Sequence, residues 1–201
     1  MKFTEVQLET HRLKELKSFY TETLGLPLIF ENKRSFMVRV GSSKLKFSRA
    51  EEGEPVYHFA CNIPENQLAE AKVWISSRCN LIQKDGKDEY RFESWNADAI
   101  YFYDPAGNIL ELIARHNLKN STSAPFSAES FLAISEVGYA VEDVRLFSRH
   151  IKDELGGKLY DGDERTFAAI GDEEGLVIVV PVGRVWFPTD QPAESFPVVI
   201  M

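Results

Sequence analysis

The sequence has 201 residues, of which 44% are hydrophobic, and a formal net charge of −8 at pH 7. This length allows one large domain or two small ones, with enough apolar residues for a sizeable core. The acidic balance argues against nucleic acid and anionic membranes as partners, because both attract basic proteins. Only two cysteines occur, and no segment resembles a signal sequence or a membrane span. We therefore expect a soluble, cytoplasmic protein without disulfides.

The first fifty residues predict a strand, a helix and three more strands. Residues 3–9 alternate between apolar and polar side chains, as in a half-buried strand. Apolar residues at helical spacing begin at Leu13 and end at Leu24, and Gly25 can close the helix in a left-handed conformation. Three short strands are then predicted, at residues 26–30, 35–40 and 44–48.

The same order begins again twice along the chain. After a polar linker at residues 51–55, a strand is expected at 56–63 and a helix from Pro64 to about Asn80. A segment rich in Asn, Ser and Ala then separates this part from a third strand and helix. The remaining predicted elements are strands at 81–82, 90–95, 99–103, 109–113 and 134–141, a helix at 144–155, and strands at 158–160, 166–170, 176–180 and 198–201.

The helices show that these segments are internal repeats, which we call modules 1, 2 and 3. The apolar residues that follow Leu13 and Val144 fall at the same offsets. The alignment makes Glu5, His58 and Glu136 equivalent positions on the first strands of the modules. A single sheet with one helix cannot cover both its faces, so modules should pair. We expect modules 1 and 2 to pair (residues 1–117), followed by a linker (118–130) and by module 3 (131–201), which forms a homodimer.

The last strand of each module offers a second equivalent position, occupied by Lys46, Glu111 and Ile178. Glu111 follows a turn that contains Asp104-Pro105 and Gly107-Asn108. A carboxylate in so apolar a strand is costly unless it is paired, hydrogen-bonded or bound to a metal. If modules 1 and 2 pair, Glu111 converges with Glu5, Lys46 and His58 on one concave face.

The repeated unit and the pattern Tyr101-x-x-Asp104-Pro105-x-Gly107-x-x-x-Glu111 resemble the vicinal oxygen chelate superfamily, which includes glyoxalase I, extradiol dioxygenases and bleomycin resistance proteins. The resemblance covers residues 3–115 and, more weakly, 131–180. It implies an α+β fold in which βαβββ modules 1 and 2 form a curved mixed sheet around a cavity, with a third such module. It also implies a small-molecule substrate or ligand.

The resemblance further implies that Glu5, His58 and Glu111 are metal ligands, since the family takes its ligands from these positions. Lys46 cannot be the fourth ligand, because an ammonium group has no free lone pair. Three ligands with open positions suit Fe, Mn, Zn or Ni, with two vicinal substrate oxygens completing the coordination shell. Lys46, Gln7 and Tyr101 are the candidate catalytic residues. Of these, Lys46 and Gln7 are placed to stabilise a developing anion.

Two features leave the function open. Extradiol enzymes have a histidine shortly before the tyrosine, where this chain has Phe92-Glu93-Ser94. An ion pair between Glu5 and Lys46 would remove the metal site and leave only a binding cavity. We therefore carry three hypotheses: a metal-dependent enzyme, a metal-free sequestration protein like the bleomycin resistance proteins, and a regulatory ligand-binding protein. Glu136 is interpreted as structural, because its module has no second carboxylate.

Overall fold

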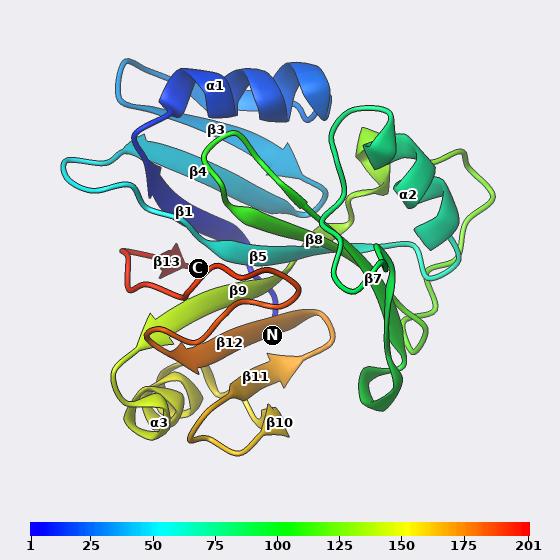
Figure 1. Cartoon of the computed structure of the whole chain (residues 1–201). Coiled ribbons are helices and arrows are strands. Elements are labelled where there is room, and N and C mark those ends of the chain that lie inside the picture. The colour runs from blue at the N-terminus through cyan, green and yellow to red at the C-terminus, as the bar shows by residue number, and fades with distance from the viewer.

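The computed structural model describes residues 1–201 and contains two mixed sheets, with a helix for each expected module (Figure 1). The element order runs strand, helix and three strands, three times over. Module 1 comprises β1 (Glu5–Thr10), α1 (Leu13–Ser18) with a π-helical turn (Phe19–Thr23), β2 (Leu28–Glu31), β3 (Ser35–Val40) and β4 (Ser43–Arg49). Module 2 comprises β5 (His58–Ile63), α2 (Leu68–Ser76), β6 (Tyr90–Phe92), β7 (Ala97–Tyr103) and β8 (Ile109–Arg115). Module 3 comprises β9 (Ala133–Val141), α3 (Val144–Leu155), β10 (Leu159–Gly162), β11 (Ala168–Asp172) and β12 (Gly175–Pro181), and β13 (Val199–Ile200) follows. The predicted α+β fold class is confirmed.

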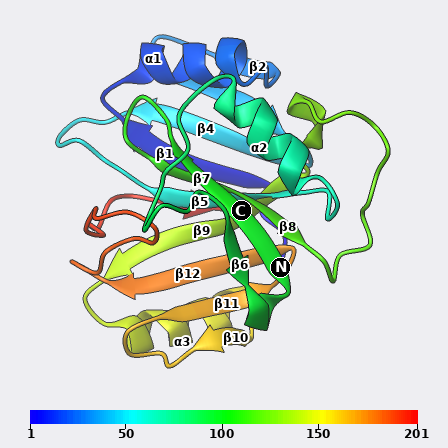
Figure 2. The same cartoon turned by 45° about the vertical axis from the view of Figure 1, so that its right-hand side comes forward.

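The pairing of the modules differs from the prediction. Modules 2 and 3 share the eight-stranded sheet, in the order β10-β11-β12-β9-β5-β8-β7-β6, which curves as Figure 2 shows. The two first strands, β5 and β9, are antiparallel neighbours at its centre, with Phe59 opposite Val137. Module 1 lies in a separate five-stranded sheet, β13-β1-β4-β3-β2. The expectation that modules 1 and 2 pair is therefore wrong, because module 2 pairs with module 3 within the chain.

The C-terminal strand explains why β1 has no module beside it. β13 runs antiparallel along the free edge of β1, with Val6 opposite Ile200. The amide of Thr4 donates to the carbonyl of Met201 at 2.7 Å, and the amide of Met201 donates to that of Glu5 at 2.9 Å. β13 thus occupies the edge that β9 occupies on β5. A homodimer stays a prediction.

The core has two parts, one on each face of the eight-stranded sheet. The larger part lies between the two sheets and the helices and includes Leu8, Phe47, Phe59, Leu112 and Val137. The smaller part fills the concave face of the eight-stranded sheet. Its members, which include Ala60, Tyr101, Ile113, Ile178 and Trp186, line or support the candidate site described below.

The helix ends follow the predicted chemistry. Gly25 and Gly156 have φ angles of +67° and +68°, which a residue with a side chain adopts only with strain. The side chain of Asp143 accepts a hydrogen bond from the amide of Leu146 and caps α3. No helix combines the length and hydropathy that crossing a membrane requires.

Candidate metal centre

His58 begins β5 and is buried, with 6% of its surface exposed. Its Nδ1 lies 3.2 Å from the carbonyl oxygen of Ile109. Because a carbonyl only accepts, this contact places the ring proton on Nδ1 and leaves Nε2 with a free lone pair. Burial lowers the pKa of His58 to about 4, so the ring is neutral at pH 7.

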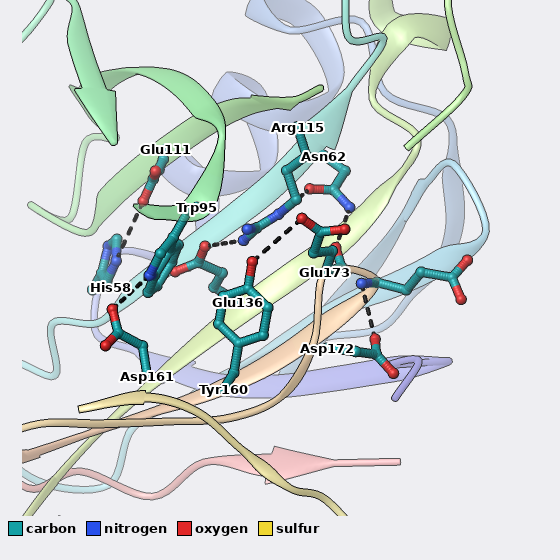
Figure 3. Close-up of polar contacts among 11 residues, drawn as sticks. His58, Asn62, Trp95, Glu111, Arg115, Glu136, Tyr160, Asp161, Asp172 and Glu173 are labelled. Atoms are coloured by element: carbon teal, nitrogen blue, oxygen red, sulfur yellow. Dashed lines mark hydrogen bonds and ion pairs between the residues drawn. The ribbon is translucent and has the colours of Figure 1, made fainter. Parts of the chain in front are cut away.

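Glu111 lies on the adjacent strand β8 and points toward the histidine ring (Figure 3). Its Oε2 is 3.7 Å from Nε2 of His58, which is too far for a hydrogen bond. Burial raises the pKa of Glu111 well above its usual value, and the neighbouring charge of Glu136 raises it further. Two lone-pair donors therefore face each other in a buried place, an arrangement that a cation or a proton between them would stabilise.

Glu136 is the third member of the group and comes from module 3. It lies on β9 opposite Ala60, and its Oε1 forms a buried ion pair with Nη2 of Arg115. The Nε of Arg115 also donates to Oδ1 of Asn62 at 3.1 Å, so the guanidinium is fixed at a second point. Burial raises the pKa of Glu136, while Arg115 opposes that rise. One carboxylate oxygen of Glu136 has no ion-pair partner.

One ligand atom each from His58, Glu111 and Glu136 lies within 4.8 Å of the others. One imidazole nitrogen and two carboxylates are a donor set that divalent transition metals accept. A histidine that donates its second N–H to a backbone carbonyl is also typical of metal-bound histidines. The two carboxylates exceed the single guanidinium by one negative charge, which a divalent cation would offset. The residues present therefore fit a divalent metal.

The equivalent positions on the two paired modules explain this geometry. His58 and Glu136 occupy the same place on the central strands β5 and β9, while Glu111 and Ile178 occupy the same place on the last strands β8 and β12. The hydrocarbon of Ile178 stands where a fourth ligand would be. It leaves a three-residue face that is open toward a cavity.

The cavity above this group has a volume of about 260 Å³ and largely aromatic walls. Tyr101 faces Glu111 across strands β7 and β8, and burial raises the pKa of its phenol well above the usual value. The far wall is fixed by Trp95, whose Nε1 donates to Asp161 at 2.6 Å (Figure 3). Trp186 and Phe187, from the segment after β12, also line the cavity.

The structure brings together only some of the residues that the sequence predicted. His58, Glu111 and Tyr101 line one cavity. Glu5, Gln7 and Lys46 lie on β1 and β4 of the other sheet and do not line it. They are separated from it because module 1 does not share a sheet with module 2.

Glu5 also has partners that differ from those expected. Its Oε1 accepts a hydrogen bond from Gln7 at 2.8 Å, and its ion-pair partner is Lys44, at 3.9 Å, rather than Lys46. The parallel register explains the difference, because Glu5 is opposite Lys44 while Lys46 is opposite Gln7. The ion pair between Glu5 and Lys46, which the sequence left open as an alternative, is therefore not formed.

The sequence indicated a structural role for Glu136 and did not identify Arg115. Glu136 was already aligned with His58 by the repeat, so pairing modules 2 and 3 would have identified it. Arg115 follows Glu111 by four residues on β8, which places both side chains on the same face of the strand. An arginine in the apolar run Ile109–Arg115 is a signal that a buried acid lies nearby.

Comparisons with known proteins agree with this geometry at the level of the fold. No protein-family model matches the sequence, and no curated protein matches it. A glyoxalase I mutant from Zea mays is similar in structure, with a TM-score of 0.61 and 14% identity, over 99% of this chain and 73% of that one. A Bacillus subtilis protein assigned provisionally as a dioxygenase has a TM-score of 0.59 and 17% identity, over 92% of this chain. This chain spans 65% of the length of that protein. The chain thus has a fold similar to those of the Zea mays glyoxalase I and of the Bacillus subtilis protein, as the resemblance implied.

Proposed function

We propose that this protein is a divalent-metal-dependent enzyme that acts on a small organic molecule through vicinal oxygens. His58, Glu111 and Glu136 are the proposed metal ligands. The observation that carries the proposal is the buried lone pair of Nε2 of His58, which faces Oε2 of Glu111 at 3.7 Å. The mixed nitrogen and oxygen donors suit Mn, Fe, Zn or Ni.

The bound metal would supply Lewis-acid polarisation of the substrate oxygens. The surrounding residues have distinct tasks. Arg115 orients Glu136 and neutralises one of the two carboxylates. The Nδ1 contact to Ile109 fixes the tautomer of His58. Tyr101 places a phenol beside Glu111. The aromatic walls of the cavity limit the access of water to the three proposed metal ligands at its bottom.

A metal-free binding protein is the second candidate, and one observation favours it. Because the pKa of Glu111 is raised, its carboxyl group can be protonated, and this proton can take the place of a metal beside Nε2 of His58. The cavity would then bind a small apolar molecule without reacting with it. The bleomycin resistance type of protein is the model for this alternative.

Metal titration of protein stripped with a chelator separates the two candidates. We expect one Co²⁺ or Mn²⁺ ion to bind per chain, as measured by calorimetry, and a visible absorption band to appear with Co²⁺. His58→Ala, Glu111→Ala and Glu136→Ala should each weaken binding by at least about tenfold, since each removes a direct ligand. Glu5→Ala is the matched control, because Glu5 is the equivalent residue of module 1, and it should bind metal like the wild type. Loss of binding in Glu5→Ala, or no binding by the wild type, contradicts the proposal.

A further inference from the structure

A second cavity lies beside the first, on the other side of Trp186. Its volume is about 250 Å³, against about 260 Å³ for the cavity above the proposed metal ligands. Its walls combine aromatic side chains with polar groups, and they include Tyr57, Tyr139, Phe147, Phe196, Glu194 and Ser195. Only His58 and Trp186 line both cavities. These two side chains therefore form the partition between them.

The indole ring of Trp186 packs against the eight-stranded sheet. Its ring centroid is 5.1 Å from that of His58. A Cβ atom on Gly138 would lie 2.8 Å from Cη2 of Trp186 and 3.1 Å from Cζ2, closer than carbon atoms pack. Gly138 has an ordinary φ angle, so its missing side chain serves the close approach of the indole and not the backbone conformation.

The backbone around Trp186 is also fixed. Its amide donates to the carbonyl of Gln191 at 2.9 Å, and its carbonyl accepts from the amide and the hydroxyl of Thr189 at 2.8 and 2.7 Å. Only 8% of Trp186 is exposed. The neighbouring Phe187 lines the first cavity alone and is 44% exposed. The indole is thus a fixed wall, whereas the phenyl ring belongs to the mouth of the cavity.

The chemistry of the walls indicates what the first cavity accepts. Apart from the proposed metal ligands at the bottom of the cavity, only two lining side chains carry a formal charge, Asp161 and Arg184. Both lie at the rim, and each has an interaction partner. Arg184 donates to the carbonyl of Thr166 and lies over the ring of Phe167, and Asp161 accepts from Trp95. The cavity therefore suits a compact apolar body that presents oxygens to the base.

We infer that Trp186 determines how long a ligand the site accepts, because it closes the first cavity against a second cavity with partly aromatic walls. The inference rests on the proposed function in one respect, because the proposed metal centre places the oxygens of the ligand at the bottom of the first cavity. Removing the indole joins the two cavities through the space beside His58. An alkyl chain that starts at the base of the first cavity then extends toward Tyr57 and Phe196.

Hydroxamic acids test this inference, because they chelate metals through two oxygens and are available with different tails. On the Co²⁺-loaded wild type we expect benzohydroxamic acid to bind more tightly than octanohydroxamic acid. Trp186→Ala should reverse this order, with a gain of about tenfold or more for the octanoyl compound, because several methylenes become buried. Acetohydroxamic acid, which is too short to reach the partition, should bind both proteins equally. Trp186→Leu serves as a second variant with a smaller change of volume.

Phe187→Ala is the matched control, since it also removes an aromatic ring from the first cavity but leaves the partition in place. It should weaken benzohydroxamic acid without a gain for octanohydroxamic acid. Equal changes for all three compounds in Trp186→Ala, or the same octanoyl gain in Phe187→Ala, would overturn the inference.

A metal-free arm separates this inference from the proposed function. If Co²⁺ does not bind the wild type, the proposed function fails, and thermal stabilisation by benzyl alcohol and 1-octanol replaces the chelators. Trp186→Ala should then gain stabilisation from 1-octanol but not from benzyl alcohol. Absence of that gain would overturn the inference independently of the failure of the proposed function.

Discussion

Modules 1 and 2 have the same order of elements but differ in what lies beside their first strands. The first strand of module 1, β1, has β13 at its edge, whereas that of module 2, β5, has β9 from module 3. The equivalent residues consequently have different surroundings. The side chain of Glu5 on β1 is 16% exposed and has polar neighbours, whereas that of His58 is 7% exposed and faces two buried carboxylates.

This difference shows that the site belongs to the pair of modules and not to a single one. Module 1 supplies Glu5 and Lys46 at the right positions, but its concave face has no second module to complete it. In the eight-stranded sheet, β8 and β9 lie on either side of β5 and bring Glu111 and Glu136 to His58. Convergence of three ligands requires this shared sheet.

The largest expected effect comes from breaking the buried ion pair of the paired modules. Arg115→Met leaves Glu136 buried without its cation and should lower the free energy of unfolding by about 3–5 kcal/mol. Denaturation in urea measures the change, and metal affinity should fall as well, because Glu136 loses its orientation. A change below about 1 kcal/mol would show that Arg115 and Glu136 do not form the pair described.

The matched change in module 1 is Lys44→Met. It removes the partner of Glu5, whose contact of 3.9 Å involves a lysine side chain that is 47% exposed. Water screens such a pair, so the stability should change by no more than about 1 kcal/mol. A loss of stability as large as that of Arg115→Met would contradict the expectation that the exposed ion pair of module 1 contributes less than the buried ion pair of modules 2 and 3.

An intermediate loss of stability is expected from a substitution at the contact between modules 1 and 2. Tyr20 of module 1 donates to Oδ2 of Asp104, in the turn between β7 and β8, at 2.8 Å. Tyr20→Phe leaves that buried acceptor with one donor fewer and should cost about 1–2 kcal/mol of stability. Thermal and urea denaturation measure the loss. An unchanged stability would contradict a link between the modules through this bond.

The pH dependence of the same contact gives a second measurement. Burial raises the pKa of Asp104 from 3.8 to about 6, although its hydrogen bonds oppose the rise. Between these two values the unfolded chain is ionised while the folded one holds the proton, so this group makes stability fall as pH rises through that window. Tyr20→Phe removes a donor that favours the ionised form and should raise the pKa further. Carboxyl ¹³C shifts of Asp104 follow the titration.

A local effect at the edge of β1 should come from removing residues 199–201. Without β13, the amide of Thr4 loses its acceptor on Met201, and the edge of β1 becomes free. Hydrogen exchange at Thr4 should accelerate, with a stability loss of about 1 kcal/mol, while the amides of β5 keep their protection. Unchanged exchange at Thr4 would contradict the role of β13 as the partner of β1.

Most of the fold could be predicted from the sequence because the elements depend on local patterns. Alternation defined β1 and β9, helical spacing defined α1 and α3, and Gly25 and Gly156 ended those two helices as expected. The pairing of modules could not be predicted in this way, since it depends on contacts between residues far apart in the chain. The burial of the strands distinguishes them: β5 is buried on both faces, whereas β1 has one polar, partly exposed face.

In the candidate site, too, the residues within one module could be predicted, whereas the residue that depends on module pairing could not. His58 and Glu111 were predicted because both lie within module 2, where one repeat sets their register. Glu5 was predicted to be the third ligand because modules 1 and 2 were expected to pair, and Glu136 was interpreted as structural because module 3 has no second carboxylate. Both glutamates occupy the same position of the repeat, and only the antiparallel pairing of β5 with β9 decides between them.

Anomalous diffraction from crystals soaked with Mn²⁺ would locate a metal bound by modules 2 and 3. We expect one strong peak at the bottom of the aromatic cavity, about 2.0–2.3 Å from Nε2 of His58 and from one oxygen each of Glu111 and Glu136. The surface of module 1 around Glu5 should show none. A peak at Glu5, or a cavity in which Glu111 contacts His58 directly with no metal between them, would rule out the proposed metal centre.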